Sequence, residues 1–307
     1  MRVAFAGTPE FAATVLRGLL ESGHEVGLVI SQPDSRRGRG RRRASPPVAA
    51  LARERGLPLL QPPDISQAAG EISRYDVLVV AAYGQILRPD TLYAAPHGAY
   101  NVHASLLPAY RGAAPVERAI MNGERETGVT IIKMDEGLDT GPIALQRSFP
   151  IPPEMTGGEL AGELARLGAE AMVEVLDRLE SGTLNLTEQD SDRATYAPRI
   201  TPEDQVIDWS RSAREVHDLV RALAPHIGAR ARHPEVEGPV KIWRTRVHRE
   251  EGGGSPGPGE IRAEEGRIFV GCGTGVVEVL ELQLPGGRRL GAAEFLRGHR
   301  LGGALRR

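Results

Sequence analysis

Apolar and polar positions at the start of the chain alternate in the order strand, helix, strand. Residues 2–6 form a short apolar run of the kind found in a buried strand. Apolar positions then recur with a helical period over residues 11–19, with Thr8 as the expected N-cap and Pro9 at the first helical position. Residues 26–30 predict a second strand. This order predicts an α/β domain with a Rossmann-like beginning.

The same kind of pattern continues through the first two thirds of the chain. The apolar run at 76–82 is typical of a central parallel strand that is covered on both faces. Further helices are predicted at 48–55, 115–122 and 157–180, and further strands at 57–62, 99–103, 127–134 and 145–149. The long stretch at 157–180 carries apolar residues at helical spacing, which predicts a packing helix.

The last third has a different pattern, because short β-like runs alternate with glycine-rich turns. After a polar, turn-rich stretch, the pattern predicts one helix at 213–223 and strands at 240–247, 259–263, 267–270 and 276–284. Short strands with such turns indicate a small barrel. We therefore expect a first domain at 1–189, a linker at 190–205 and a second domain at 206–307.

Composition places few limits beyond those of an ordinary globular protein. The chain has 307 residues, enough for two domains, and 40% of them are hydrophobic and 25% charged. No apolar run is long enough to cross a bilayer, and residues 3–6 are too few for the core of a signal peptide. Cys272 is the only cysteine, which excludes an internal disulfide. We expect a cytoplasmic monomer.

Charge is unevenly distributed along the chain, although the formal net charge is only -2. Residues 206–307 carry 17 Lys or Arg and 13 Asp or Glu, whereas residues 1–205 carry 21 Lys or Arg and 27 Asp or Glu. Six arginines fall within eight residues: Arg36, Arg37, Arg39, Arg41, Arg42 and Arg43. Their mutual repulsion predicts a loop that is mobile until an anion binds. A basic segment and a basic last third together indicate a large polyanion that is contacted at two places.

Two polar residues on the strand predicted at 99–103 are the first candidates for chemistry. Asn101 and His103 stand two apart, so their side chains should share one side of the sheet while Val102 faces the other. An amide beside an imidazole at the end of a strand could hold a developing oxyanion and move a proton. Two satisfied, partly buried polar residues explain the same pair equally well.

Several other kinds of site are disfavoured by the sequence. The eight histidines and the single cysteine show no metal-ligand spacing, so we expect no metal. No nucleophile elbow surrounds Ser105, and no Gly-Lys-Ser/Thr motif indicates an ATP site. The first strand is not followed by Gly-x-Gly-x-x-Gly, which disfavours a dinucleotide.

A longer motif contains both candidate residues. Residues 101–108, Asn-Val-His-Ala-Ser-Leu-Leu-Pro, together with Tyr-Arg-Gly at 110–112, resemble the signature of the folate-dependent formyltransferases. Residues 134–142 resemble the aspartate-bearing loop of that family, and the similarity extends from the turn at 7–11 to residues 295–298. The resemblance implies a Rossmann-like N-terminal formyltransferase domain followed by a smaller C-terminal OB-like β-barrel domain that binds tRNA.

The resemblance also implies a reaction. A formyl group would pass from 10-formyltetrahydrofolate, as co-substrate, to the α-amino group of methionyl initiator tRNA. We hypothesise that Asn101 and His103 donate to the formyl oxygen, while Asp139 accepts the ammonium proton and orients His103. Asp135 lies in the same loop as a rival carboxylate, and the family pattern favours Asp139.

Binding residues follow from the same resemblance. The family places the pterin of the folate against the loop that contains Tyr83 and Gly84. The other expected folate-binding residues are Ser105, Leu106, Leu107 and Pro108. In the members that formylate tRNA, the insertion matching the six arginines enters the acceptor stem, and this implies tRNA binding for all six. Arg41, Arg42 and Arg43 are the best candidates for phosphate or base contacts.

Four other functions stay open. Glycinamide ribonucleotide formyltransferases share the Asn-His-Asp core but end after the first domain, and sugar-nucleotide formyltransferases share it with or without a C-terminal extension. An enzyme that hydrolyses formylfolate needs neither the arginine segment nor a basic second domain. A non-catalytic RNA-binding protein on this fold has no need of all three core residues. The arginine segment favours tRNA as the acceptor over a small amine.

Overall fold

The computed structural model describes residues 1–37, 42–249, 256–299 and 302–307, with the backbone alone at 36, 37, 42 and 43. Internal contacts divide the chain into two units. Unit 1 comprises Met1–Pro115, Glu126–Pro150 and Ala161–Ala197, and unit 2 comprises Val116–Arg125, Ile151–Leu160 and Pro198–Arg307. Two short segments of the predicted first domain thus belong to unit 2 by their contacts. The domain boundaries at 189 and 205 stay predictions.

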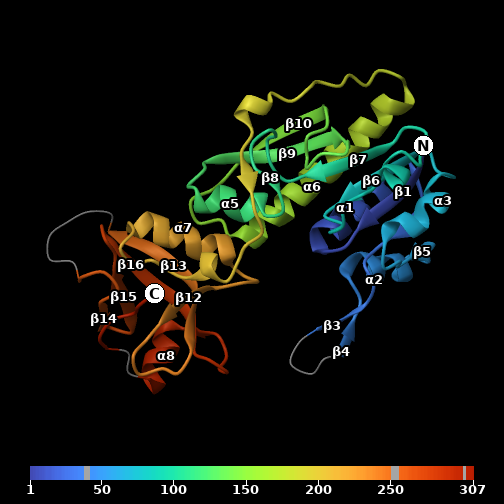
Figure 1. Cartoon of the computed structure of the whole chain (residues 1–307). Coiled ribbons are helices and arrows are strands. Elements are labelled where there is room, and N and C mark those ends of the chain that lie inside the picture. Colours follow the sequence, from blue (N-terminus) through green and yellow to red (C-terminus); the bar gives the residue numbers. More distant parts are fainter. Residues whose placement is uncertain (38–41, 250–255, 300–301) are drawn as a thin grey trace. The chain divides into compact units, whose positions relative to one another are not determined.

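Unit 1 is built on a seven-stranded sheet with the order β10-β9-β7-β6-β1-β2-β5 (Figure 1). The parallel strands are β1 (Arg2–Gly7), β2 (Glu25–Ile30), β5 (Leu59–Leu60), β6 (Val77–Ala81) and β7 (Ala99–His103). Strand β9 (Glu126–Lys133) is antiparallel to β7, and β10 (Ile143–Pro150) is antiparallel to β9. With α1 (Glu10–Leu20) between β1 and β2, the predicted α/β beginning is confirmed. All five residues of β6 are buried, as predicted for a central strand.

The start of helix α1 differs from the prediction by one residue. Pro9, rather than Thr8, is the N-cap, and it makes no side-chain capping bond. The Thr8 hydroxyl instead donates a hydrogen bond of 2.7 Å to the carbonyl oxygen of Tyr83. This hydroxyl therefore joins the carboxyl ends of β1 and β6, and α1 begins without a side-chain cap.

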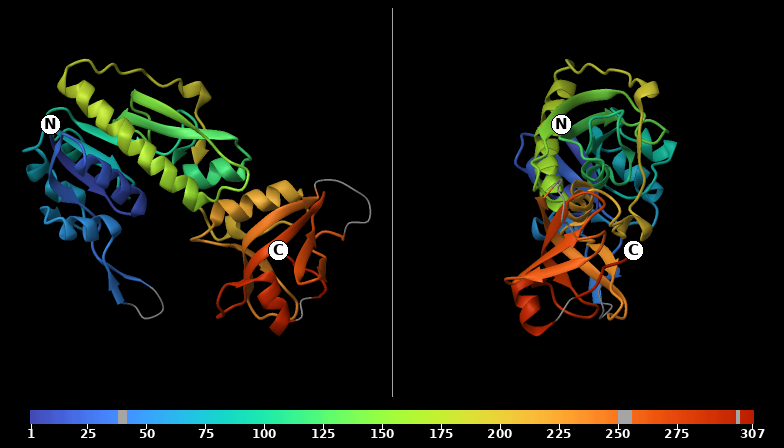
Figure 2. Two further views of the ribbon diagram at one scale, coloured as in Figure 1. Left: turned by 180° about the vertical axis from the view of Figure 1, so that it is seen from behind. Right: turned by 90° about the vertical axis from the view of Figure 1, so that its left-hand side faces the viewer.

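Different helices cover the two faces of the unit 1 sheet (Figure 2). On one face, α6 (Gly157–Glu180) packs against α1 and β7: a Cβ built on its Gly168 would lie 2.5 Å from Val102 Cγ1. On the other face, Ala99 of β7 belongs to a buried cluster with residues of η1 (Ile65–Ala68), α3 (Ala69–Ile72) and α4 (Pro89–Leu92). The prediction that Val102 faces one side of the sheet and Asn101 and His103 the other is therefore confirmed.

The two ends of the arginine segment form the arms of a hairpin, which the sequence did not predict. Strands β3 (Ser35–Arg37) and β4 (Arg42–Ala44) pair antiparallel, and the hairpin extends away from the sheet of unit 1 (Figure 1). The backbone pairing of the two arms is compatible with repulsion between the arginine side chains, and the mobility of the loop before an anion binds stays a prediction. Arg39 and Arg41 lie outside the described residues.

The remaining elements of unit 1 are α2 (Pro47–Glu54), β8 (Arg111–Gly112), η2 (Ser191–Arg193) and β11 (Tyr196–Ala197).

Unit 2 contains an antiparallel sheet packed against helices. Its order is β12 (Ala229–Arg232), β13 (Pro239–Arg249), β16 (Val276–Gln283), β15 (Arg267–Gly271) and β14 (Ile261–Glu264), with β17 (Leu290–Gly291) paired to β16. Helix α7 (Ala213–Leu223) has the predicted bounds and packs on β13 and β16. Strand β12 was not predicted, because its sequence, Ala-Arg-Ala-Arg, carries only a weak apolar signal. Helix α8 (Ala292–Gly298) was not predicted either. The other elements outside the sheet are α5 (Pro115–Met121) and η3 (Glu203–Gln205).

Residues near the C-terminus lie against both edges of the unit 2 sheet. Arg306 and Arg232 of β12 exchange two backbone hydrogen bonds of 2.8 Å, and Ala304 forms an antiparallel bridge with Glu260 beside β14. These contacts are isolated bridges, so the part of the sheet that the structure describes is not continuously paired around a barrel. Across the described residues of both units, no helix is both long and apolar enough to cross a membrane.

Candidate functional site

The carboxyl end of β7 brings the three predicted catalytic residues together. Asn101 Nδ2 lies 3.4 Å from Asp139 Oδ1, and His103 Nδ1 lies 3.6 Å from Asp139 Oδ2. The side chains of His103 and Asp139 are 6% and 14% exposed, so most of the surrounding space is protein. The shared side of Asn101 and His103 was predicted from the strand period. Both contacts to the carboxylate are long, which leaves room for a reacting group or a proton between them.

The orientation of His103 follows from its second nitrogen. Nε2 lies 2.9 Å from the carbonyl oxygen of Tyr110, which can only accept a hydrogen bond. Nε2 therefore carries a proton, and Nδ1 of a neutral ring directs its lone pair toward Asp139. A lone pair and a carboxylate that face each other across 3.6 Å leave room for a proton to be transferred between them.

Asp139 is the loop carboxylate that reaches this site, and Asp135 is not. Asp135 Oδ1 accepts hydrogen bonds from Gly137 N at 3.0 Å and from Thr140 Oγ1 at 2.6 Å, so it stabilises the turn of its own loop. Asp139 Oδ2 accepts instead from the backbone N–H of Gly112 at 2.9 Å. The geometry thus decides between two carboxylates that the residues by themselves left open.

Tyr83 lies on the same side of the sheet as the catalytic candidates. It shares a buried cluster with Ala99, and β6, which precedes it, runs parallel to β7. Burial raises the pKa of Tyr83 to about 12, the charge of Asp64 adds to this, and the hydroxyl has no hydrogen-bond partner among the described residues. Gly84 follows with a φ of 91°, in the region that favours glycine. Parallel strands end at one edge of a sheet, so this loop borders the site.

Two polar side chains, Thr130 of β9 and Gln146 of β10, support the loop after β7. Thr130 Oγ1 donates to Ser105 O at 2.6 Å and accepts from Leu107 N at 3.1 Å. Gln146 Nε2 donates to Leu107 O at 2.7 Å. Ser105 and Leu107 are buried, whereas Leu106 and Pro108 are partly exposed. Of the four residues predicted to bind folate here, two can therefore offer surface and two support them.

Some supporting residues were not found from the sequence. Arg111 and Gln189 join the segment after β7 to the Asp139 loop through hydrogen bonds. Arg111 is part of the Tyr-Arg-Gly motif at 110–112, and its place in that motif could have identified it as a supporting residue. Gln189 lies in a polar, turn-rich stretch without any signal.

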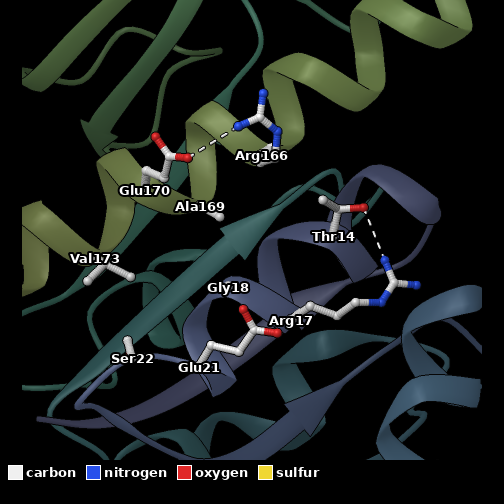
Figure 3. A pocket seen from close by; sticks show the side chains of 9 residues that line it. All are labelled: Thr14, Arg17, Gly18, Glu21, Ser22, Arg166, Ala169, Glu170 and Val173. Carbon is white, nitrogen blue, oxygen red and sulfur yellow. Dashed lines mark hydrogen bonds and ion pairs between the residues drawn. The ribbon is translucent and has the colours of Figure 1, made fainter.

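A groove of about 600 Å³ lies elsewhere in unit 1, between α1 and α6 (Figure 3). Its rim is polar, with Arg17 contacting Thr14 and Arg166 contacting Glu170. Because α6 covers the face to which Val102 points, this groove is on the opposite side of the sheet from Asn101. It is not the cavity of the candidate site. Among the described residues, no cluster of three or more His, Cys, Asp or Glu side chains could hold a metal ion.

Comparison with known proteins gives a consistent result. Residues 1–176 match the family model for formyl transferase, and residues 199–300 match the model for the formyl transferase C-terminal domain. The chain is 84% identical to the methionyl-tRNA formyltransferase of Rubrobacter xylanophilus, over 100% of both chains. It is 45% identical to the methionyl-tRNA formyltransferase of Nitrosospira multiformis, over 98% of this chain and 97% of that one.

A solved structure agrees in fold. It is the crystal structure of an N-formyltransferase from Helicobacter canadensis in complex with folinic acid and dTDP-3-aminofucose. That structure aligns with a TM-score of 0.68 at 19% identity, over 94% of this chain and 99% of that one. At this identity the likeness concerns the fold alone.

Proposed function

The chain belongs to the formyl transferase family, and from this premise we propose that it transfers the formyl group of 10-formyltetrahydrofolate to the α-amino group of methionyl initiator tRNA. The observation that carries the proposal is the meeting of Asn101, His103 and Asp139 in a chain so similar to named methionyl-tRNA formyltransferases. The product, formylmethionyl-tRNA, serves translation initiation.

The three residues divide the reaction between them. The neutral amine attacks the formyl carbon, a new C–N bond forms, and negative charge grows on the formyl oxygen. Asn101 Nδ2, which makes only a long contact to Asp139, donates to that oxygen. The bond to the folate nitrogen then breaks, and the proton lost by the ammonium is returned to this departing arylamine. No strong base is needed, because an α-amino group has a pKa of about 8.

His103 and Asp139 act as the proton store in this scheme. Asp139 accepts the ammonium proton directly or through water, and His103 Nδ1, 3.6 Å away, shares it. The hydrogen bond from Nε2 to Tyr110 O keeps the ring in this orientation. For His103 also to donate to the formyl oxygen, Nδ1 has to carry the shared proton or the ring has to leave Tyr110, so we assign the larger share of oxyanion stabilisation to Asn101.

We place the folate at the edge where β6 and β7 end. Tyr83 and Gly84 would border the pterin, and Leu106 and Pro108 would offer apolar contact from the other loop. The buried Tyr83 hydroxyl, unpartnered among the described residues, supports a polar ligand group there. Ser105 and Leu107 contribute by holding the loop, as their burial and hydrogen bonds indicate.

We propose that tRNA is contacted by the arginine hairpin and by unit 2. Six arginines within eight residues and the excess of basic residues in 206–307 support two contact regions on one polyanion. We further propose an OB-like barrel for unit 2, supported by the bridges that residues 304 and 306 make to the two edges of its sheet. Replacing Arg41, Arg42 and Arg43 by alanine should raise the KM for tRNA and leave folate affinity unchanged.

The proposed function is tested by single-turnover transfer of labelled formyl from 10-formyltetrahydrofolate. Methionyl initiator tRNA, free methionine and a sugar-nucleotide amine are offered in parallel. Label on the tRNA alone, lost in His103→Ala, supports both the function and the site. Label only on the sugar-nucleotide amine would show that this amine, and not the tRNA, is the acceptor. Binding of tRNA without any transfer would favour a non-catalytic RNA-binding protein.

A further inference from the structure

Gln189 joins three backbone or side-chain groups of the candidate site in unit 1. Its Nε2 donates to Asp139 O and to Gly141 O, each at 2.8 Å. Its Oε1 accepts from Arg111 Nη2 at 2.7 Å and from Arg111 Nε at 3.2 Å. Gln189 thus spans from β8 to the loop that carries the proposed catalytic carboxylate.

Only one orientation of the Gln189 amide satisfies this environment. A carbonyl oxygen can only accept, and a guanidinium can only donate. The NH₂ group must therefore face the two carbonyls, and the amide oxygen must face Arg111. A carboxylate of the same size could still accept from Arg111, but it could not donate to the Asp139 loop.

The backbone of Asp139 explains why such an anchor is needed. Its φ is 52°, in the left-handed region that a residue other than glycine adopts at an energetic cost. The hydrogen bonds to Asp139 O and Gly141 O hold the loop in this conformation at the strained residue itself and two residues after it. Gly112 N, next to Arg111, binds the Asp139 carboxylate itself. Strand β8 consequently binds the Asp139 side chain directly, through Gly112 N, and the Asp139 backbone indirectly, through Arg111 and Gln189.

Strand β8 is itself fixed, so it can serve as a reference for the loop. It pairs with β11, and a Cβ on Gly112 would lie 2.9 Å from Ala197 O, which leaves no space for a side chain. Arg111 is only 3% exposed, so its guanidinium is confined. The anchor therefore connects a mechanically constrained strand to a strained catalytic loop.

We propose that Gln189 is a positioning residue for formyl transfer, with Arg111 as its support, and that it sets the distance from Asp139 to His103 and Asn101. This inference rests on the proposed function, since it concerns the same reaction. Gln189 does not touch the reacting atoms. Its loss should therefore lower the rate of the chemical step and leave folate binding, which uses other loops, unchanged.

The test compares two substitutions in the full chain. Gln189→Met has a similar length and removes all four hydrogen bonds. Gln189→Glu keeps an acceptor for Arg111 and removes both donors to the loop. Glu188→Met, at the exposed neighbouring position, is the matched control. The measured quantities are the single-turnover rate at saturating 10-formyltetrahydrofolate and methionyl initiator tRNA, the folate dissociation constant and the unfolding temperature.

We expect both Gln189 variants to lose about tenfold to a hundredfold in single-turnover rate, as small displacements of catalytic groups do. Folate affinity should stay within twofold, and the control should match the parent. A Gln189→Glu variant as fast as the parent would overturn the proposal, because Gln189 would then serve only Arg111. An unchanged rate in Gln189→Met would overturn it as well. If the parent itself transferred no formyl group to the tRNA, the proposed function would fail instead.

Discussion

Each unit of the protein contains a buried histidine, an aspartate and an arginine close together, but the two sets differ in how they are held. In unit 1, His103, Asp139 and Arg111 come from three separate segments of the chain. The nearest nitrogen–oxygen distance between His103 and Asp139 is 3.6 Å, which is longer than a hydrogen bond. Arg111 does not approach the carboxylate directly and acts through Gln189.

In unit 2, the corresponding residues are neighbours on helix α7. Arg221 Nε donates to Asp218 Oδ1 at 2.7 Å, and both side chains are almost fully buried. The two ring nitrogens of His217 lie 3.1 Å from Thr245 Oγ1 and 3.2 Å from Pro153 O. The hydrogen bonds of this set have normal lengths, and none of its buried side-chain polar atoms lacks a partner among the described residues.

The difference is the one expected between the proposed reactive arrangement and a structural one. Short, satisfied contacts stabilise a fold, because a buried charge without a partner costs much more than a partnered one. Long contacts between groups fixed by their backbones leave hydrogen-bonding capacity for a substrate. Residue types by themselves do not distinguish the two sets, but distances and satisfaction do.

The largest expected effect is on catalysis in unit 1. His103→Ala and Asp139→Asn should each lower kcat/KM for formyl transfer by about 10²–10⁴, the usual contribution of a positioned acid–base group. The unfolding temperature should change by only a few degrees in Asp139→Asn, because the amide oxygen can still accept from Gly112 N, and by more in His103→Ala, which loses the bond to Tyr110 O. Steady-state kinetics and thermal unfolding by circular dichroism measure the two quantities. A rate within a few-fold of the parent would contradict the catalytic assignment.

The next effect is on stability in unit 2. Asp218→Asn should lower the free energy of unfolding by about 3–5 kcal/mol, because the buried Arg221 charge loses its carboxylate. Urea unfolding measures this loss, with the exposed Asp192→Asn as control. The single-turnover rate of the folded protein should stay within twofold. A strong loss of rate without a loss of stability would show that the unit 2 set is not merely structural.

His217 provides a pH test of the same set. Burial lowers the pKa of His217, and Arg221 adds to this, whereas Pro153 O, Glu154 and Asp218 act in the opposite direction. Below an unfolded pKa of about 6.5 the unfolded chain therefore binds a proton that the folded chain does not, so stability falls as the pH is lowered. The slope is at most about 1.4 kcal/mol per pH unit. It should disappear in His217→Gln when urea unfolding is compared between pH 7.5 and 5.5.

The smallest effect concerns a more exposed pair in unit 2. Arg118 donates two hydrogen bonds to Asp204, at 2.6 and 2.9 Å, and this holds the pKa of Asp204 at about 2. Because solvent screens the pair, Asp204→Asn should cost only about 1 kcal/mol of stability near neutral pH. The contribution is present above the unfolded pKa of about 3.9 and is lost as the pH falls toward 2. Unfolding curves of parent and variant that differ at pH 7 and converge as the pH is lowered through 2 would confirm it.

Local patterns predicted much of the fold. The bounds of α6 and α7 agree with the apolar periodicity, and the burial of β6 was predicted from its continuous apolar run. Predictions failed where a long-range contact replaced a local preference. Thr8 bonds Tyr83 instead of capping α1, and β12, with two small alanines facing the core, is held by pairing with β13.

The candidate site shows the same division. The common side of Asn101 and His103 follows from the strand period, and Asp139 was favoured over Asp135 by family resemblance. The hydrogen bonds of Asp135 to its own loop were not readable from the sequence. Gln189 lies fifty residues from Asp139 in the chain, within a stretch whose composition indicates only turns.

The sequence by itself therefore determined the order of the elements, the family and which side of β7 is polar, because these depend on neighbouring residues and on recurrent motifs. Only the tertiary structure decided which carboxylate meets His103, what holds its loop and which His–Asp–Arg set is satisfied. Those properties depend on distances between residues far apart in the chain. Such distances arise when strands pair and loops are anchored, and no local pattern encodes them.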